Sequence, residues 1–220
     1  MDATTDAPAG QSVKRGVGRP RLHSAETERE MIFDAAYAAI RDHGDASLSV
    51  SDILTAASVS TRSFYRHFQS KDDLLCAMYR CDAVRAAERL VQRLQRASSP
   101  VEAVGTWIDE IISFREVVPK AERVTLLGSI VANRADGSER VAREARALLT
   151  APLSAAVAAG AAIGDFASND PEQDAAMVAA VVFDAAGLSA PHPPSPSAPC
   201  DRDAVHTFCF RALGANRPDQ

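Results

Sequence analysis

The sequence has few cysteines, and they do not stand where a metal site or a disulfide framework needs them. The four cysteines of this 220-residue chain are Cys76, Cys81, Cys200 and Cys209. None forms a CxxC pair, and none stands beside a histidine at the spacing of zinc ligands. We therefore interpret them as reduced core thiols of a cytoplasmic protein and expect no metal and no cofactor, although a redox switch stays open.

The sequence also lacks the motifs of the common enzyme classes. It contains no recognisable set of nucleophile, base and orienting residue, and no glycine-rich loop that could cradle a phosphate. Gly16 and Gly18 come nearest to such a loop, but they lie in a polar N-terminal segment. These absences argue against a helical enzyme, which is the alternative from another functional class.

Long hydrophobic runs are scarce. The first 24 residues contain no apolar segment of the kind that a secretory signal requires. Residues 147–164 carry no charge, but they are mostly alanine and include Pro152 and Gly160. This composition favours a buried helix over a membrane span, and we expect no association with a membrane.

What the sequence does have is alanine, which dominates an apolar fraction of 46%. Valine and threonine cluster nowhere, and alanine is the best helix former, so the sequence predicts an all-α protein. The formal charge of −5 is unevenly placed. Residues 1–71 carry nine Lys/Arg and nine Asp/Glu, whereas residues 72–220 carry fifteen and twenty. The acidity therefore belongs to the larger C-terminal part.

Residues 1–23 are predicted to be a disordered basic arm. Lys14, Arg15, Arg19 and Arg21 give a local charge of +4 without a nearby acid. A basic arm ahead of a compact unit is a common way to reach a polyanion. A merely solvated tail is the alternative that the arm alone leaves open.

Residues 24–71 carry three short helical patterns. In the first, which follows a cap at Ser24, the apolar stripe falls at helical spacing and ends before Gly44. Ser49 and Ser60 are predicted N-caps of two further short helices. A turn of three to four residues joins these two helices, which is the outline of a helix-turn-helix.

The second of these helices has two distinct faces. At about 100° per residue, Phe64 and Phe68 point inward together. The outward face carries Arg62, Arg66 and Gln69, with Ser63 and Tyr65 on its flanks. Arginine suits guanine edges and phosphates, hydroxyls suit phosphates, and the free N–H groups that follow Ser49 and Ser60 suit phosphates too. The pattern predicts a recognition helix.

Residues 26–78 resemble the N-terminal DNA-binding domain of TetR-family transcriptional repressors. The resemblance is carried, in order, by IFDAA, HG, SVSDI, VS, FYRHF and SKDDL. The chain departs from the family at Ser58 and Arg62, where the family often has glycine. Serine tolerates a tight turn, but Arg62 adds a long side chain near the bases, so the operator sequence cannot be inferred from the family.

The resemblance implies roles for individual residues. Tyr65, His67 and Lys71 would contact DNA phosphates, while Thr61, Arg62 and Ser63 would lie nearest the base edges. The Arg19 and Arg21 side chains of GRPR would follow the minor groove. Each role has an alternative: Tyr65 as a packing residue, His67 as a satisfied, partly buried histidine, Lys71 as an ordinary first-turn lysine, and Arg62 with Arg66 as a solvated face.

Residues 72–220 are predicted to form a larger helical domain. Helices are expected over residues 71–94, from Pro100, from Pro119, over 139–162, over 171–187 and over 201–213, with a proline-rich loop at 189–200. The family resemblance implies that this domain binds a ligand and forms a homodimer. The small residues of the last two helices, 171–187 and 201–213, favour them as the interface, with packing within one chain as the alternative.

The ligand is expected to bind between the helices of this second domain. Candidate lining residues, each of which could instead be plain core, are Met78, Trp107, Phe114, Leu127 and Ile130. The sequence thus predicts a DNA-binding transcriptional regulator, a repressor that a small molecule releases from a double-stranded operator. The alternative is a DNA-binding protein without an inducer, either architectural or constitutive.

Overall fold

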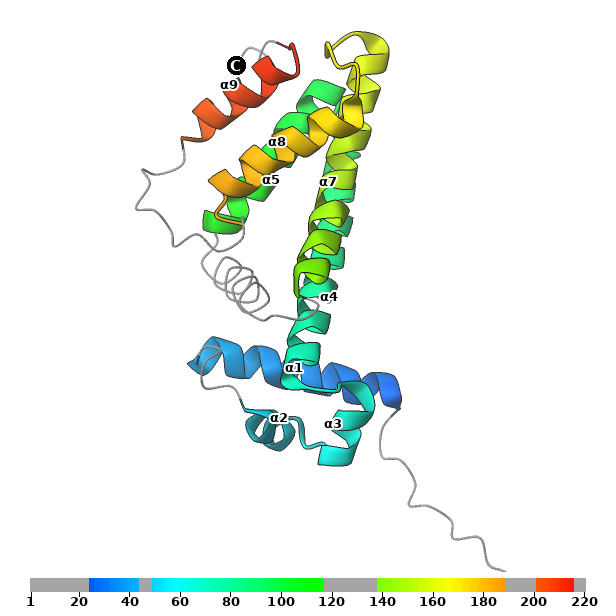
Figure 1. Ribbon diagram of the computed structural model, residues 1–220, viewed down its shortest axis with the longest axis vertical. Coiled ribbons are helices and arrows are strands. Elements are labelled where there is room, and N and C mark those ends of the chain that lie inside the picture. The colour runs from blue at the N-terminus through cyan, green and yellow to red at the C-terminus, as the bar shows by residue number, and fades with distance from the viewer. Residues whose placement is uncertain (1–23, 44–48, 117–137, 189–200, 216–220) are drawn as a thin grey trace, which may run out of the picture.

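All regular elements of the described residues are helices, as predicted. The computed structural model describes residues 24–43, 49–116, 138–188 and 201–215. The basic arm, the helix expected from Pro119 with Leu127 and Ile130, and the proline-rich loop with Cys200 lie outside the described residues. A small unit of three helices lies at one end of the molecule, and α4 runs from it into a bundle of longer helices (Figure 1).

The helices of the small unit are α1 (Ala25–His43), α2 (Val50–Ala57) and α3 (Thr61–His67). The other described helices are α4 (Lys71–Leu94), α5 (Pro100–Glu116), α7 (Ser138–Ile163), α8 (Pro171–Ala185) and α9 (Arg202–Ala212). The serine hydroxyls before α2, α3 and α4 each accept the backbone N–H three residues on, at 3.1 Å. These bonds satisfy free donors of the first turn, so the capping serines decide where each helix begins.

The small unit has its own hydrophobic core. Its buried side chains come from α1, α2 and α3, and also from the first turns of α4 through Leu74, Leu75 and Met78. The core therefore extends beyond residue 71, where the sequence pattern placed the boundary. Met78 is completely buried in this core, which departs from its predicted role in a ligand pocket of the second domain.

A second core lies between α4, α5, α7, α8 and α9. Trp107 is its largest fully buried side chain, and its indole Nε1 donates a hydrogen bond to the carbonyl oxygen of Leu149 at 2.8 Å. The Phe183 ring meets the indole at a centroid distance of 5.8 Å in an edge-on arrangement. Phe114 is partly buried against the same core. Trp107 and Phe114 thus lie in the second core, whereas Met78 does not.

The alanine-rich helix α7 is less buried than its sequence suggested. Of the described helices, the segment Glu139–Ile163 is the one that is long and apolar enough to cross a membrane. Only 22% of its most apolar 18-residue stretch is buried within the protein. Its buried face includes Val141, Leu153 and Val157, and the helix packs against α4, α5 and α8. The prediction of a buried helix is therefore right for one face only. Core helices of soluble proteins satisfy the same length and composition criteria, so α7 is weak support for a membrane span.

Three of the four cysteines lie in the described helices, and none of these three forms a disulfide. Cys209 is buried, and burial raises the pKa of its thiol to about 11. Cys76 and Cys81 are half-buried on α4. The buried thiol of Cys209 behaves as a small apolar side chain, as predicted from its sequence context.

Candidate DNA-binding surface

The turn between α2 and α3 has a left-handed residue at its first position. Ser58 has φ +53°, and among the described non-glycine residues it alone has a positive φ. Its N–H and that of Val59 donate to the carbonyl oxygens of Thr55 and Leu54 at 3.3 and 3.2 Å. These bonds end α2 and turn the chain into the cap of α3 at Ser60. The turn therefore forms where family members often have glycine, with serine in the strained conformation.

Aromatic side chains hold α3 against α1. Phe64 is fully buried and Phe68 is 2% exposed, as the periodicity of the sequence predicted. The Phe68 ring stacks on Phe33 of α1 at a centroid distance of 5.7 Å. The guanidinium of Arg29 lies over both of these rings, 5.1 and 5.2 Å from their centroids. This cluster fixes the buried side of α3 and leaves its opposite face to solvent.

The exposed face of α3 presents part of the predicted contact set. Thr61, Arg62 and Tyr65 are exposed, and the Tyr65 side chain keeps 56% of its surface accessible. That exposure argues against Tyr65 as a packing residue, although its ring meets Phe64 edge-on at 5.3 Å. The capping residues Ser49 and Ser60 are exposed as well, and Lys71 is half-buried at the start of α4.

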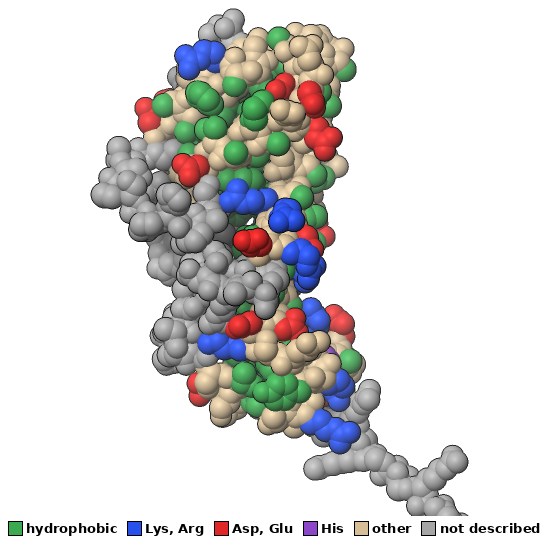
Figure 2. All heavy atoms as spheres, in the orientation of Figure 1, with side chains coloured by type: hydrophobic (Ala, Val, Ile, Leu, Met, Phe, Trp, Pro, Cys, Tyr) green, Lys and Arg blue, Asp and Glu red, His purple; other side chains and the backbone are tan. Residues whose placement is uncertain are grey.

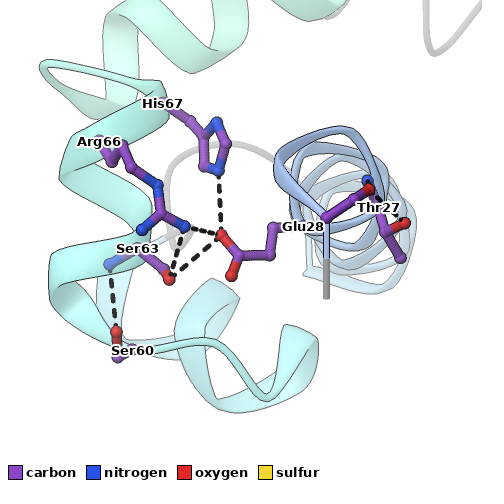
Figure 3. A network of polar contacts seen from close by, with 7 residues as sticks. Thr27, Glu28, Ser60, Ser63, Arg66 and His67 are labelled. Carbon is purple, nitrogen blue, oxygen red and sulfur yellow. Dashed lines mark hydrogen bonds and ion pairs between the residues drawn. The ribbon is translucent and has the colours of Figure 1, made fainter. Parts of the chain in front are cut away.

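The other three predicted contact residues of α3 meet a carboxylate of α1 (Figure 3). Ser63 donates to Oε2 of Glu28 at 3.2 Å, and Nε2 of His67 lies 3.1 Å from the same oxygen. Arg66 forms an ion pair with this oxygen and also donates to the Ser63 hydroxyl at 3.2 Å. Glu28 is 8% exposed, and the His67 side chain is 10% exposed. We call these four residues the Glu28 cluster.

The Glu28 cluster bears on two of the alternatives left by the sequence. His67 is a partly buried histidine with a satisfied ring nitrogen, as one alternative held. Arg66 is 37% exposed, but it is paired rather than simply solvated. A carboxylate can only accept hydrogen bonds, so Nε2 of His67 carries the proton that it donates to Glu28.

The surroundings of Glu28 favour its ionised form. The hydrogen bond from His67 is the largest cause, and the bonds from Arg66 and Ser63 add to it, so the pKa of Glu28 lies below its usual range. Burial acts in the opposite direction, because it disfavours the charged carboxylate. The donors outweigh burial, and the carboxylate stays charged at neutral pH.

This lowered pKa predicts how the stability of the small unit depends on pH. A carboxyl group whose pKa is lower in the folded state stabilises the fold above its ordinary pKa of 4.5 and loses that contribution as the pH falls through the folded value. We expect Glu28→Gln to unfold at a lower temperature than the wild type at pH 7, with the difference shrinking below about pH 4.5. Thermal unfolding from pH 7 to pH 3 measures it, with the exposed Glu26→Gln as control. A difference that is constant with pH would contradict the expectation.

Glu28 was not among the predicted site residues. In the sequence, Glu26 and Glu28 fit the general preference for acids in a first turn, where they complement the helix dipole. The partners of Glu28 lie 35 to 39 residues away in the chain. Helical periodicity compares residues a few positions apart, so the pattern gave no signal for a contact between these two helices.

Comparison with known proteins identifies a family that the helices of this surface match. Residues 32–78 match the family model of bacterial regulatory proteins of the tetR family, and the match runs from α1 through α2 and α3 into α4. Solved structures of TetR regulators from Haloarcula marismortui and from a Rhodococcus species share the fold over most of this chain. Residues 32–78 are therefore a segment of the TetR type. The resemblance seen in the sequence and the predicted all-α architecture are thereby confirmed.

Three relatives illustrate the range of proteins that the whole chain resembles. The HTH-type transcriptional regulator BetI of Agrobacterium fabrum is 27% identical over 61% of this chain and 68% of its own length. A transcriptional regulator from Saccharomonospora viridis, solved in complex with choline, has a TM-score of 0.65 at 16% identity, covering 89% of this chain and all of that one. RolR in complex with resorcinol has a TM-score of 0.62 at 17% identity, covering 88% of this chain and 90% of that one. At these identities the solved structures establish the fold.

Proposed function

We propose that this TetR-family transcriptional regulator is a cytoplasmic homodimeric repressor that binds a specific operator and leaves it when a small molecule binds. The observation that carries the DNA-binding part is the exposed face of α3. Thr61, Arg62 and Tyr65 project from a helix whose other side is fixed by Phe64 and Phe68. A helix held in this way presents its side chains at defined positions, which base recognition in a major groove requires.

Within that face we assign different roles to different residues. Arg62 is exposed on the first turn of α3 and is proposed to contact base edges together with Thr61. Tyr65, Lys71 and the free N–H groups behind the capping serines are proposed to contact phosphates. Arg19 and Arg21 remain proposed minor-groove contacts from the sequence alone. The ion pair of Arg66 removes it from the residues that we expect to reach DNA directly.

Dimerisation is proposed to involve the exposed sides of α8 and α9. On α8, Ala176, Met177, Ala180 and Val181 are exposed and fall at helical spacing. On α9, Ala204, Phe208 and Ala212 form a second exposed stripe, with Thr207 and Arg211 along one side of it. Figure 2 shows hydrophobic side chains exposed over these two helices. A second copy of the chain would bury both stripes in a four-helix interface, which is isologous in a two-fold dimer.

A dimer matters because operators are read by two recognition helices at once. Two such helices must lie about 34–36 Å apart to enter successive major grooves on one side of the duplex. Any change that alters this separation lowers DNA affinity. A ligand that favours the wrong separation therefore releases the operator, and DNA opposes ligand binding by the same coupling free energy.

The helix α4 is suited to carry that coupling. Its first turns lie in the core of the small unit through Leu74 and Leu75, and Leu90 lies in the core of the second unit. Arg80 of α4 and Glu144 of α7 form an ion pair at 3.1 Å between these two ends. A displacement of α7 or α5 around a ligand would therefore move the end of α4 that belongs to the DNA-binding unit. The choline and resorcinol bound by relatives support a small-molecule ligand, which we place near Trp107 and Phe114 in the second core.

The first test is selection of bound sequences from a random duplex pool at near-physiological salt, with the DNA upstream of the protein's own gene as a second probe. We expect a palindromic or pseudo-palindromic sequence that binds roughly 10³-fold more tightly than random DNA. Binding that only fades as salt increases, without enrichment of any sequence, would instead indicate an architectural DNA-binding protein.

A variant pair then separates base contacts from phosphate contacts. Arg62→Ala is expected to relax the choice at one or two operator positions, at a cost of about 1–3 kcal/mol on the selected sequence. Lys71→Ala is expected to weaken binding to all sequences nearly equally. Arg89→Ala, which removes an exposed arginine from the C-terminal part of α4, is the control. Equal losses for Arg62→Ala on every sequence would contradict base recognition by Arg62.

A further inference from the structure

We propose that Glu28 is a specificity-determining residue that withholds Arg66 from the DNA backbone. The proposal rests on the DNA-binding function proposed above, because it concerns how strongly that surface discriminates between sequences. Glu28 lies on α1 and makes no part of the exposed face of α3. Its carboxylate nevertheless engages three side chains of that helix, and two of them carry donors of the kind that bind phosphates.

The first step of the argument is the position of Arg66. Its guanidinium is turned toward α1, where it meets Oε2 of Glu28 and the hydroxyl of Ser63 (Figure 3). It lies one turn of helix away from the exposed Arg62 and follows directly after the exposed Tyr65. Without Glu28, the same side chain could extend from the surface that faces DNA. The ion pair therefore decides whether α3 presents one arginine or two.

The second step concerns what an additional arginine would do. A flexible cation on a DNA-binding surface attracts phosphates of every sequence, because the backbone charge does not depend on the bases. Such a contact strengthens nonspecific complexes, in which the protein slides along the duplex. By pairing Arg66 within the protein, Glu28 removes one contact of this kind.

The third step concerns the position of α3 itself. Three donors from successive turns of α3 converge on one nearly buried carboxylate oxygen. The Phe33–Phe68 stack and the Glu28 cluster together attach α3 to α1 by an apolar and a polar contact. Weakening the polar contact frees Arg66 and Ser63 and loosens the helix. The ratio of operator affinity to random-DNA affinity then falls for two reasons. Affinity for the operator gains little or decreases, and affinity for random DNA increases.

Glu28→Gln tests the proposal, since it keeps the size of the side chain and one acceptor oxygen but removes the charge. We expect binding to random DNA to strengthen about fivefold per protomer near 0.15 M salt, with a salt dependence steeper by about one per protomer. Operator affinity is expected to stay equal or to fall, so the ratio of operator to random affinity decreases by at least the same factor. A residue with only a structural role would weaken both complexes, because an unfolded fraction binds neither.

A double-mutant cycle identifies the group that is released. Arg66→Gln alone is expected to leave random-DNA affinity and its salt dependence unchanged within about twofold, because Arg66 is withheld in the native protein. In the Arg66→Gln background, Glu28→Gln is expected to have no further effect on random DNA. If it still strengthened binding there, the charge of Glu28 and not the release of Arg66 would be responsible, and the proposal would be wrong.

Two further outcomes separate a failure of this inference from a failure of the proposed function. A uniform loss of affinity in Arg66→Gln, with a salt dependence shallower by about one, would identify Arg66 as a phosphate contact and overturn the proposal even if Glu28→Gln failed to fold. A wild-type protein that binds operator and random DNA equally would overturn the proposed function, and this inference with it. Thermal unfolding of each variant, measured in parallel, ensures that affinities are compared between folded proteins.

Discussion

Replacing Phe208 with glutamate is expected to convert the regulator into a monomer and to lower its affinity for its operator by about a thousandfold. Phe208 is the largest apolar side chain exposed on α9, with 45% of its surface accessible. In a two-fold dimer the substitution acts twice, once from each protomer. Aromatic anchors near the centre of an interface contribute about 2 kcal/mol or more each, which gives about 4 kcal/mol for the pair and a factor near 10³.

The loss should appear in DNA binding because the proposed dimer would recognise two half-sites together. A monomer presents one recognition helix and contacts one half-site only, so it loses the binding free energy of the second half-site. Sedimentation or light scattering across a range of protein concentrations gives the oligomeric state, and titration with the selected operator gives the affinity. Operator affinity that falls while the dimer persists would mean that Phe208 acts by another route.

The control for this experiment is Val84→Glu. Val84 is an exposed apolar residue of α4 with 39% of its surface accessible, close to the value for Phe208. The Val84→Glu variant introduces the same charge on a different helix, so the proposed dimer should persist. If Val84→Glu dissociated the protein while Phe208→Glu did not, the interface would involve α4 rather than α8 and α9, and the proposed dimer would be wrong.

The outline of the small unit could be predicted from sequence because local chemistry determines it. Ser49 and Ser60 stand where a helix must satisfy its first N–H groups, and the structure places a cap at each. Phe64 and Phe68 stand four residues apart, so any helix that contains both brings them to one side. These features depend on residues a few positions apart, which a single sequence displays directly.

The Glu28 cluster and the position of Met78 could not be predicted in the same way. Both depend on which segments meet in space, and helical periodicity does not predict contacts between different helices. The pattern around Met78 correctly predicts a buried side chain, but the same pattern fits either core that α4 passes through. Glu28 satisfies a first-turn preference equally well whether or not α3 lies beside it. Its exposure of 8% is a consequence of tertiary packing alone.

The Glu28 cluster also changes how the exposed face of α3 is understood. The sequence pattern assigned every polar residue between Thr61 and His67 to DNA. In the folded protein these residues divide into two groups. Thr61, Arg62 and Tyr65 are exposed, whereas Ser63, Arg66 and His67 are bound to Glu28 of α1, with Arg66 still partly exposed. The second group has a separate use, because a recognition helix needs a fixed position as much as it needs contact residues. If the proposal is right, specificity depends partly on side chains that do not touch a base.

Phe64→Ala is expected to destabilise the small unit by about 3–5 kcal/mol, the usual cost of removing a buried phenylalanine ring. Phe64 has no exposed surface and belongs to the core that α1, α2, α3 and the start of α4 build together. A unit of this size has a small core and little stability to lose. For such a unit the loss corresponds to a decrease of about 15 °C or more in its unfolding temperature, and operator binding should be lost at the temperatures where it unfolds.

The neighbouring aromatic residue provides the matched control. Tyr65 follows Phe64 on the same helix but is 56% exposed, so Tyr65→Ala should change the unfolding temperature little while weakening DNA binding. Calorimetry of Phe64→Ala should show an early transition for the small unit and a later one, near the wild-type temperature, for the second core around Trp107. A single transition that shifts as a whole would mean that the continuous helix α4 couples the two cores into one cooperative unit. In that case a ligand bound in the second core could act on α3 by stabilising or loosening the entire molecule, rather than by displacing α4 as a rigid element.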